Sequence, residues 1–253
     1  MAKNRLLDRQ VSLLNYLTSG AAIFGDQREA SIDRALRGID LDLLHLEAHF
    51  SYEKRMEKIV AVFPNTFELF GNERTRIVRA FVETCPPVDI GHLTNARQFH
   101  DFLSARWRRR SPRPPYLRDV AACELACATV RAHVDDAGPQ TENGKSGKPR
   151  HGIRRHPGVV LLRCSYDIRT IFETGIGKTV PPKRDTPLAV VIPPGIDRPR
   201  SNRLPQVFEL SAAVFDLLCA LDHWTDPGAL SGLAEPGLLI RELAEHGLLE
   251  VHG

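Results

Sequence analysis

Long apolar runs are missing from this sequence of 253 residues. No stretch approaches the roughly 20 consecutive apolar residues that a membrane-spanning helix requires. The first twenty residues, MAKNRLLDRQVSLLNYLTSG, lack the apolar core of a secretory signal. We therefore expect a cytoplasmic protein. Hydrophobic residues make up 42% of the chain, which is sufficient for folded cores.

A strong charge of either sign is also missing. The 34 basic and 31 acidic residues leave a formal net charge of +3, which argues only weakly for nucleic-acid binding. The basic residues gather between positions 106 and 113 and between 145 and 155. A solvated helix end and a linker explain these two clusters without a ligand.

Cysteine is scarce and irregularly placed. The odd number of cysteines, without regular spacing, suits a reducing compartment; they are Cys85, Cys123, Cys127, Cys164 and Cys219. Cys123 and Cys127 are four residues apart in an alanine-rich stretch. They therefore share one face of a helix, where we interpret them as small core residues.

Motifs for catalysis or cofactor binding are not legible. The segment from Glu173 to Thr179 ends like a phosphate-binding loop, but Phe172 stands where the first glycine is required. His45 and His49 could share a metal on one helical face. Without a third ligand, surface histidines are the better interpretation. We therefore predict no catalytic residues, no metal ligands and no cofactor in this chain.

Residues 1 to 134 have apolar residues at helical spacing, interrupted by glycine, proline and asparagine. This pattern predicts a bundle of five or six helices. The expected helices run from 5 to 17, from Asp40 to the residue before Pro64, from 65 to 70, from Asn72 to Pro86, from Asn95 past Trp107, and from 116 to 134.

Residues 135 to 157 are polar and rich in glycine, which predicts a flexible linker between two domains. After it, strands are expected at 159 to 162, 188 to 192 and 207 to 210. Three helices should follow, beginning at Ser211, Asp226 and Pro236, and then a last strand or wing at 248 to 251. The expected fold class is α+β, with a winged-helix-like domain over residues 158 to 253.

The last expected helix could serve as a DNA-recognition helix. Its exposed face offers only Arg241 against Glu235, Glu242 and Glu245, and such a face repels phosphate. Peptide capture is the alternative, because an extended peptide can add to an exposed strand edge beside an apolar helix. The residues that we expect to bind the peptide are Val207, Phe208, Glu209, Leu210, Leu239, Ile240 and Leu243.

Two stretches carry a family resemblance. The first contains Phe63-Pro64 with Gly71, then Pro86-Pro87, then Phe99-His-Asp-Phe-Leu103, and then Pro115-Tyr-Leu-Arg-Asp-Val-Ala-Ala-Cys-Glu124. This order of motifs resembles the helical domain of MbnC-like proteins. These proteins are partner subunits of multinuclear non-haem iron enzymes in peptide natural-product biosynthesis. The similarity covers roughly residues 55 to 130.

The second stretch runs from Val207 to Leu218 and continues from Leu239 to Leu249. It resembles the PqqD-like recognition element that binds the leader of a ribosomally made precursor peptide. In that family the leader adds to the third strand and packs on the third helix. The resemblance maps these roles onto positions 207 to 210 and 239 to 243. The segment from Gly175 to Asp185 departs from the family pattern.

The resemblance implies a non-catalytic accessory subunit that forms a heterodimer with a TIM-barrel iron oxidase. The iron belongs to that partner, and this chain presents a cysteine of the precursor peptide to it. A TglI-like role in 3-thiaglutamate formation is favoured over a role in methanobactin formation. The alternatives are a winged-helix DNA-binding regulator and an enzyme that acts alone.

Overall fold

The computed structural model describes residues 2–25, 33–136, 151–177, 179–193, 204–230 and 235–252. The chain divides into two compact units, Met1–Arg113 and Pro114–Gly253. The first unit is helical, and the second combines helices with small sheets. The predicted α+β class is therefore confirmed. No helix among the described residues is long and apolar enough to cross a membrane.

The first unit contains helices of very different length. They are α1 (Ala2–Leu17), α2 (Gly20–Ile23), α3 (Leu41–Val62), α4 (Pro64–Leu69), α5 (Arg74–Thr84) and α6 (His92–Arg109), with the short 3-10 helices η2 (Arg34–Leu36) and η3 (Gly71–Glu73). Asp40 begins α3 as predicted, because its side chain accepts hydrogen bonds from the amides of Asp42 and Leu43.

A cluster of phenylalanine rings forms the core that joins α4, α5 and α6. Phe99 lies at its centre, with ring centroids 5.0 to 6.4 Å from those of five other phenylalanines. These neighbours are Phe63, Phe67, Phe70, Phe81 and Phe102.

Two of the expected helix starts in this unit are wrong. Asn72 does not cap α5, because the 3-10 helix η3 runs directly into it. Asn95 does not begin α6 either; the helix starts at His92, and Asn95 is buried within it at 3% exposure. The asparagine side chain is used instead to bind backbone carbonyl groups outside the helix.

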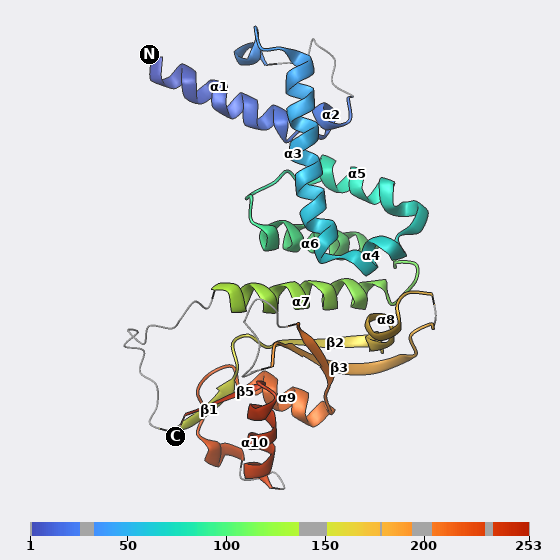
Figure 1. Cartoon of the computed structure of the whole chain (residues 1–253), viewed down its shortest axis with the longest axis vertical. Coiled ribbons are helices and arrows are strands. Elements are labelled where there is room, and N and C mark those ends of the chain that lie inside the picture. Colours follow the sequence, from blue (N-terminus) through green and yellow to red (C-terminus); the bar gives the residue numbers. More distant parts are fainter. Residues whose placement is uncertain are drawn as a thin grey trace. The chain divides into compact units, whose positions relative to one another are not determined.

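The second unit contains a three-stranded antiparallel sheet in the order β2-β3-β4 (Figure 1). Its strands are β2 (Val160–Tyr166), β3 (Lys183–Val191) and β4 (Gln206–Glu209). A separate two-stranded antiparallel sheet pairs β1 (Gly152–Arg155) with β5 (Leu249–His252). The helices are α7 (Leu117–Asp136), α8 (Arg169–Thr174), α9 (Ala212–Ala220), η5 (Pro227–Leu230) and α10 (Pro236–Glu245).

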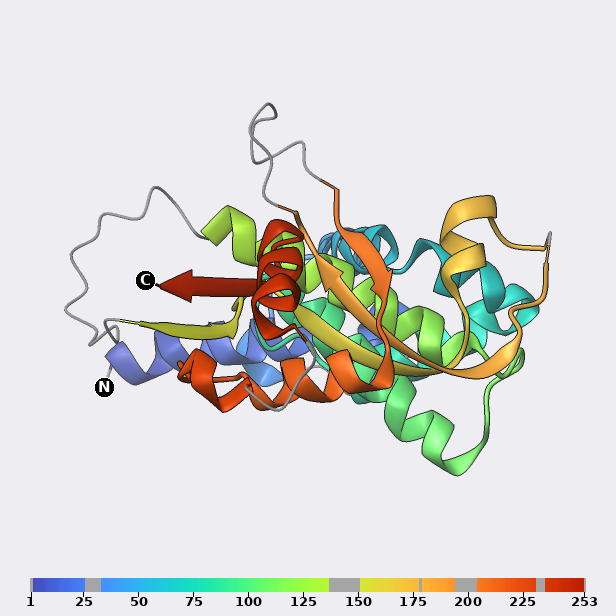
Figure 2. The same ribbon diagram turned by 90° about the horizontal axis from the view of Figure 1, so that it is seen from below.

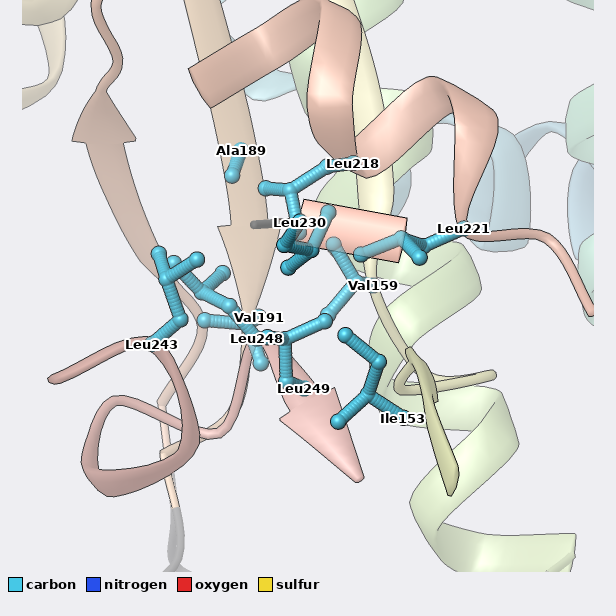
Figure 3. Packing of buried hydrophobic residues seen from close by; sticks show 10 residues of the cluster. All are labelled: Ile153, Val159, Ala189, Val191, Leu218, Leu221, Leu230, Leu243, Leu248 and Leu249. Atoms are coloured by element: carbon cyan, nitrogen blue, oxygen red, sulfur yellow. The ribbon is translucent and has the colours of Figure 1, made fainter. Parts of the chain in front are cut away.

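Helices cover both faces of the three-stranded sheet. Helix α7 packs against β2 and β3 on one face, and α9 and α10 lie on the other (Figures 1 and 2). The middle strand is accordingly buried on both sides, with Leu188, Ala189, Val190 and Val191 at 0 to 1% exposure. Ala189 and Val191 face a cluster that includes Leu218, Leu243 and Leu249 (Figure 3).

The predicted domain boundary at residue 134 is therefore wrong. Helix α7 belongs to the second unit, and the division falls between Arg113 and Pro114. Helix α7 belongs with the sheet because it covers the face of β3 that α9 and α10 leave open. Without α7, Leu188 and Val190 would be exposed to water. The continuous apolar run at 188 to 192 is the sequence signal for this burial, because a half-exposed strand would alternate.

The predicted linker at 135 to 157 is wrong at residues 152 to 155. Residues 137–150 lie outside the described residues, but Gly152–Arg155 form β1. Ile153 in this strand is completely buried and bridges to Thr225. Strand β1 was not predicted from the sequence, because GIRR contains a single apolar residue.

The elements after β4 follow the prediction closely. Ser211 caps α9 by accepting a hydrogen bond from the amide of Val214. Asp226 accepts one from Gly228 at the start of η5. Pro236 opens α10, and Gly247 ends it with a φ of 72°. Residues 231–234 of the expected second helix lie outside the described residues.

Candidate peptide-binding edge

Strand β4 is an edge of the three-stranded sheet, and among the described residues no strand lies on its outer side. Its pairing with β3 fixes which backbone groups point outward. Leu210 donates its amide hydrogen to the carbonyl oxygen of Pro187, so this is a hydrogen-bonded pair. Such pairs alternate along an antiparallel ladder. The amide and carbonyl groups of Val207 and Glu209 therefore point away from β3.

The side chains of β4 alternate between the two faces of the sheet. Phe208 and Leu210 pack against the cluster formed with α9 and α10. Val207 and Glu209 lie on the opposite face, opposite Val190 and Leu188 of β3. The predicted residues from Val207 to Leu210, the last of which follows β4, thus line both faces of the sheet, and Val207 and Glu209 supply the outward backbone groups.

Helix α10 contributes an apolar stripe beside this strand. Leu239 and Ile240 are partly buried against the cluster, whereas Leu243 is buried at 7% exposure. The ring of Phe208 stacks on His246 at the end of α10, with centroids 5.4 Å apart and planes at 25°. Leu243 is thus a core residue. The partly exposed apolar surface beside β4 comes from Phe208, Leu239 and Ile240.

An ion-pair network ties the end of β4 to the rest of the sheet. Glu209 lies 2.5 Å from Arg169 and also pairs with Arg184. Asp167 lies 2.8 Å from Arg169 and 2.5 Å from Arg184. Because Arg169 and Arg184 come from α8 and β3, the network joins three elements around the carboxylate of Glu209. It restrains β4 rather than leaving Glu209 free.

The network also changes the ionisation of its members. Hydrogen bonds from Arg169 and then Arg184 hold the pKa of Asp167 well below its ordinary value, although burial opposes this shift. The pKa of Glu209 is lowered mainly by its hydrogen bond with Arg184. Both carboxylates are therefore charged at neutral pH.

Sequence reasoning missed Asp167, Arg169, Arg184 and His246 as neighbours of the edge. The pattern Asp-x-Arg at 167 to 169 is a weak local signal for an ion pair between Asp167 and Arg169, because residues two positions apart near the end of a strand can share a face. Nothing in the sequence indicates that Arg184 reaches Glu209, which is 25 positions away. Only the pairing of β3 with β4 brings them together.

The other sequence candidates have local partners. His45 contacts the hydroxyl group of Tyr16 and the carbonyl oxygen of Ala22, and His49 pairs with Glu53 at 3.2 Å. Among the described residues, no group of three or more histidine, cysteine or acidic side chains could hold a metal.

Cys123 and Cys127 hydrogen-bond to each other in α7. Cys123 is completely buried, and this hydrogen bond together with burial raises the pKa of its thiol. Burial likewise raises the pKa of Cys164 to about 12. The thiols of Cys123 and Cys164 are therefore protonated at neutral pH. The same hydrogen bond lowers the pKa of Cys127, which is only partly buried, so the interpretation as a core residue holds for Cys123 but not for Cys127.

No protein-family model matches this chain. No curated protein matches it significantly either.

Proposed function

We propose that this chain is an accessory subunit that binds the leader of a ribosomally made precursor peptide and presents the peptide to a partner iron oxidase. The recognition element is β2, β3 and β4 with α9, η5 and α10, a winged-helix-like arrangement. The peptide adds as a further strand outside β4. This chain has no catalytic role, and the iron is held by a TIM-barrel partner in a heterodimer.

The observation that carries the proposal is the outward direction of the backbone groups of Val207 and Glu209. Two amides and two carbonyl groups, two residues apart, match the hydrogen-bonding repeat of an added strand. Phe208, Leu239 and Ile240 offer apolar contact on one side of that strand. Main-chain bonds supply affinity, and the apolar side chains supply specificity.

Tethering the leader makes the reaction of the peptide effectively intramolecular. A bound leader raises the local concentration of the peptide's cysteine at the partner's iron site. Excision of the cysteine β-carbon, as in 3-thiaglutamate formation, and oxazolone–thioamide formation are the two modifications that such a subunit would serve. Both place the chemistry on the partner.

Co-expression tests this function directly. This chain, the iron oxidase and the precursor peptide are expressed together and with each component omitted. We expect a one-to-one complex of the two proteins and modification of the peptide's cysteine only when both are present. Cysteine modification by the oxidase alone, at the same rate, would show that the accessory role is wrong.

DNA binding through α10 is the competing use of this fold. The exposed residues of α10 and its N-cap include Glu235, Glu242 and Glu245, against Arg241. This balance favours the peptide over phosphate. Tight binding to duplex DNA with a steep salt dependence would favour the regulator instead.

A further inference from the structure

The turn at residues 156–158 joins β1 of the two-stranded sheet to β2 of the three-stranded sheet. The backbone of His156 holds this turn in place. Its amide donates to the carbonyl oxygen of Leu248 at 3.0 Å, and its carbonyl oxygen accepts from the amide of Val159 at 2.9 Å. One residue is thus bonded to the positions that directly precede β5 and β2.

The imidazole ring of His156 closes the same turn. Its Nδ1 atom accepts a hydrogen bond from the amide of Gly158 at 3.0 Å. Because an imidazole nitrogen accepts only when it carries no proton, this bond assigns the proton of the neutral ring to Nε2. Nε2 lies 3.8 Å from Oε1 of Glu250 in β5. The neutral ring therefore bonds to the turn on one side and faces the two-stranded sheet on the other.

Little space is left around this ring. Gly158 is buried, and a Cβ atom added there would lie 2.9 Å from Cδ2 of His133 and 3.1 Å from Nδ1 of His156. The ring of His133, in the last turn of α7, meets that of His156 edge to face, with centroids 6.2 Å apart. Two histidines from different elements therefore pack against one backbone position that has no room for a side chain.

The charged and titratable groups that face His156 come from three elements. Arg154 of β1 donates to Glu250 of β5 at 2.6 Å, so the carboxylate near Nε2 is already paired with a guanidinium. His133 of α7 is the third group. Burial is the main reason that the pKa of His156 is lowered; Glu250 opposes this shift, whereas His133 and Arg154 add to it. The neutral ring is therefore the favoured form at pH 7.

Protonation would remove the bond that closes the turn. An imidazolium ring carries a hydrogen on both nitrogens, so it cannot accept from the amide of Gly158. Two donors would then face each other across 3.0 Å, and the amide of a buried residue would lose its partner. Either the turn opens or the ring of His156 leaves its place beside His133. Both movements break the connection between the two sheets.

We propose that His156 is an acid-sensitive switch, which holds the turn at residues 156–158 closed while its ring is neutral and releases the β1–β5 sheet from β2 when Nδ1 binds a proton. The proton comes from solvent, because the side chain of His156 is only half-buried. The switch does not depend on the proposed peptide binding, since its contacts involve no residue of β4 or α10.

The switch acts below the ordinary pKa of histidine, about 6.5. Well above that pH the ring is neutral in the folded and the unfolded chain, and the turn is closed. As the pH falls below 6.5, the unfolded chain binds a proton at His156 before the folded chain does, because the folded pKa is lower. Stability is therefore lost from about pH 6.5 down to the folded pKa, and the turn opens as the folded ring titrates.

Three full-length proteins test the switch. The test variant is His156→Asn, whose side-chain oxygen can accept from Gly158 in place of Nδ1 and does not titrate. The matched control is His223→Asn, at an exposed histidine of the same unit. The imidazole nitrogens are followed by NMR from pH 8 to pH 4. Hydrogen exchange of single amides, corrected for its intrinsic pH dependence, is measured over the same range.

In the unsubstituted chain and in the control, His156 should carry its proton on Nε2 at pH 8 and titrate below about pH 6.5. Protection of the amides of Gly158 and His156 should fall in step with this titration by up to about tenfold, the worth of one hydrogen bond. In the His156→Asn variant, protection at positions 156 and 158 should stay constant.

Three results would overturn the switch. They are a proton on Nδ1 at pH 8, amide protection that does not follow the titration of His156, and an equal loss of protection in the His156→Asn variant. Loss at Gly158 with full protection of the His156 amide would show that the turn opens without releasing Leu248, which refutes the release of the sheet. The titration of the unsubstituted chain decides the matter even where the variant fails to fold.

Discussion

Arg55 and Asn95, forty positions apart, are joined by a hydrogen bond of 2.9 Å from the guanidinium Nε to the amide Oδ1. The bond links α3 to α6 across the interior of the first unit. Because the amide oxygen is occupied by the guanidinium, the Nδ2 group is directed at the carbonyls of the 85–91 loop. One contact therefore stabilises the helix pair and sets the loop that follows α5.

Asn95→Asp tests the donor group of the Asn95 side chain, Nδ2, separately from its acceptor oxygen. Aspartate has the same shape and can still accept from Arg55, but it cannot donate to the carbonyl oxygens of Asp89 and Gly91. We expect the folded core to persist and the amide hydrogens of residues 88–91 to exchange faster with solvent. Hydrogen exchange measured by mass spectrometry checks this expectation. Unchanged exchange in the loop would mean that Asn95 does not hold it.

Asn95→Ala removes both functions of the side chain. It leaves the guanidinium Nε of Arg55 and two carbonyl groups without their partner, which should lower the free energy of unfolding by about 2–4 kcal/mol. Urea unfolding measures the change. Asn15→Ala, at an exposed position of α1, serves as the control and should alter stability by less than about 0.5 kcal/mol.

Val207→Pro tests the outer edge of β4. Its amide hydrogen points away from β3, so proline should remove a donor to the guest peptide without breaking the sheet. We expect leader affinity to fall by up to about tenfold, the worth of one lost hydrogen bond, with helical content unchanged. Fluorescence anisotropy with labelled leader peptide measures it.

Phe208→Pro is the matched control for the inner side of the same strand. The amide of Phe208 points toward β3, so proline there should break the ladder and destabilise the second unit by about 1–3 kcal/mol, the cost of leaving the carbonyl group of Ala189 without its partner. If the two proline variants were equally unstable, the assignment of inward and outward groups would be incorrect. If leader bound to the Val207 variant as tightly as before, the edge would not be its site.

Asp167→Asn tests the network around Glu209 through its pH dependence. Arginine partners lower the pKa of Asp167 in the folded state below its unfolded value of about 3.9, so the folded protein binds fewer protons there. The stabilisation is complete above that value and is lost as the pH falls through the folded pKa. We expect the wild type to be more stable than the variant by a constant amount from pH 5 to 8.

Below about pH 4 the difference between wild type and Asp167→Asn should shrink, because the unfolded wild-type chain takes up a proton at Asp167 while the folded carboxylate is still charged. Urea unfolding of both proteins between pH 2 and 8 supplies the comparison. A difference that stays the same at pH 2.5 and pH 7 would show that the ion pairs of Asp167 do not contribute to stability.

Fragments of the chain test the domain boundary. A fragment of residues 114–253 retains α7 and should fold with a cooperative thermal transition. A fragment of residues 151–253 lacks α7 and exposes Leu188 and Val190, whose burial is worth about 1.5–3 kcal/mol for each side chain. We expect the shorter fragment to aggregate or to lose its cooperative transition. Circular dichroism during heating distinguishes the two fragments.

Local chemistry made several elements predictable from the sequence alone. The caps at Asp40 and Ser211 were correct because a capping side chain bonds to amides only two or three residues away. The end of α10 at Gly247 was correct for the same reason, since a left-handed residue needs no distant partner. The position of β4 at the edge of its sheet agrees with the expected exposed strand edge at 207 to 210, and peptide binding there stays a prediction.

Contacts between distant residues were decided only by the tertiary structure. The sequence determined that helices come first, that strands follow, and that an apolar stripe lies on α10 beside a short strand. The packing of α7 on the sheet, the arginine partners of Glu209 and the role of Asn95 depend on residues separated by 25 positions or more. Such pairs leave no periodic signal, because burial and charge neutralisation are satisfied across the folded chain rather than along it.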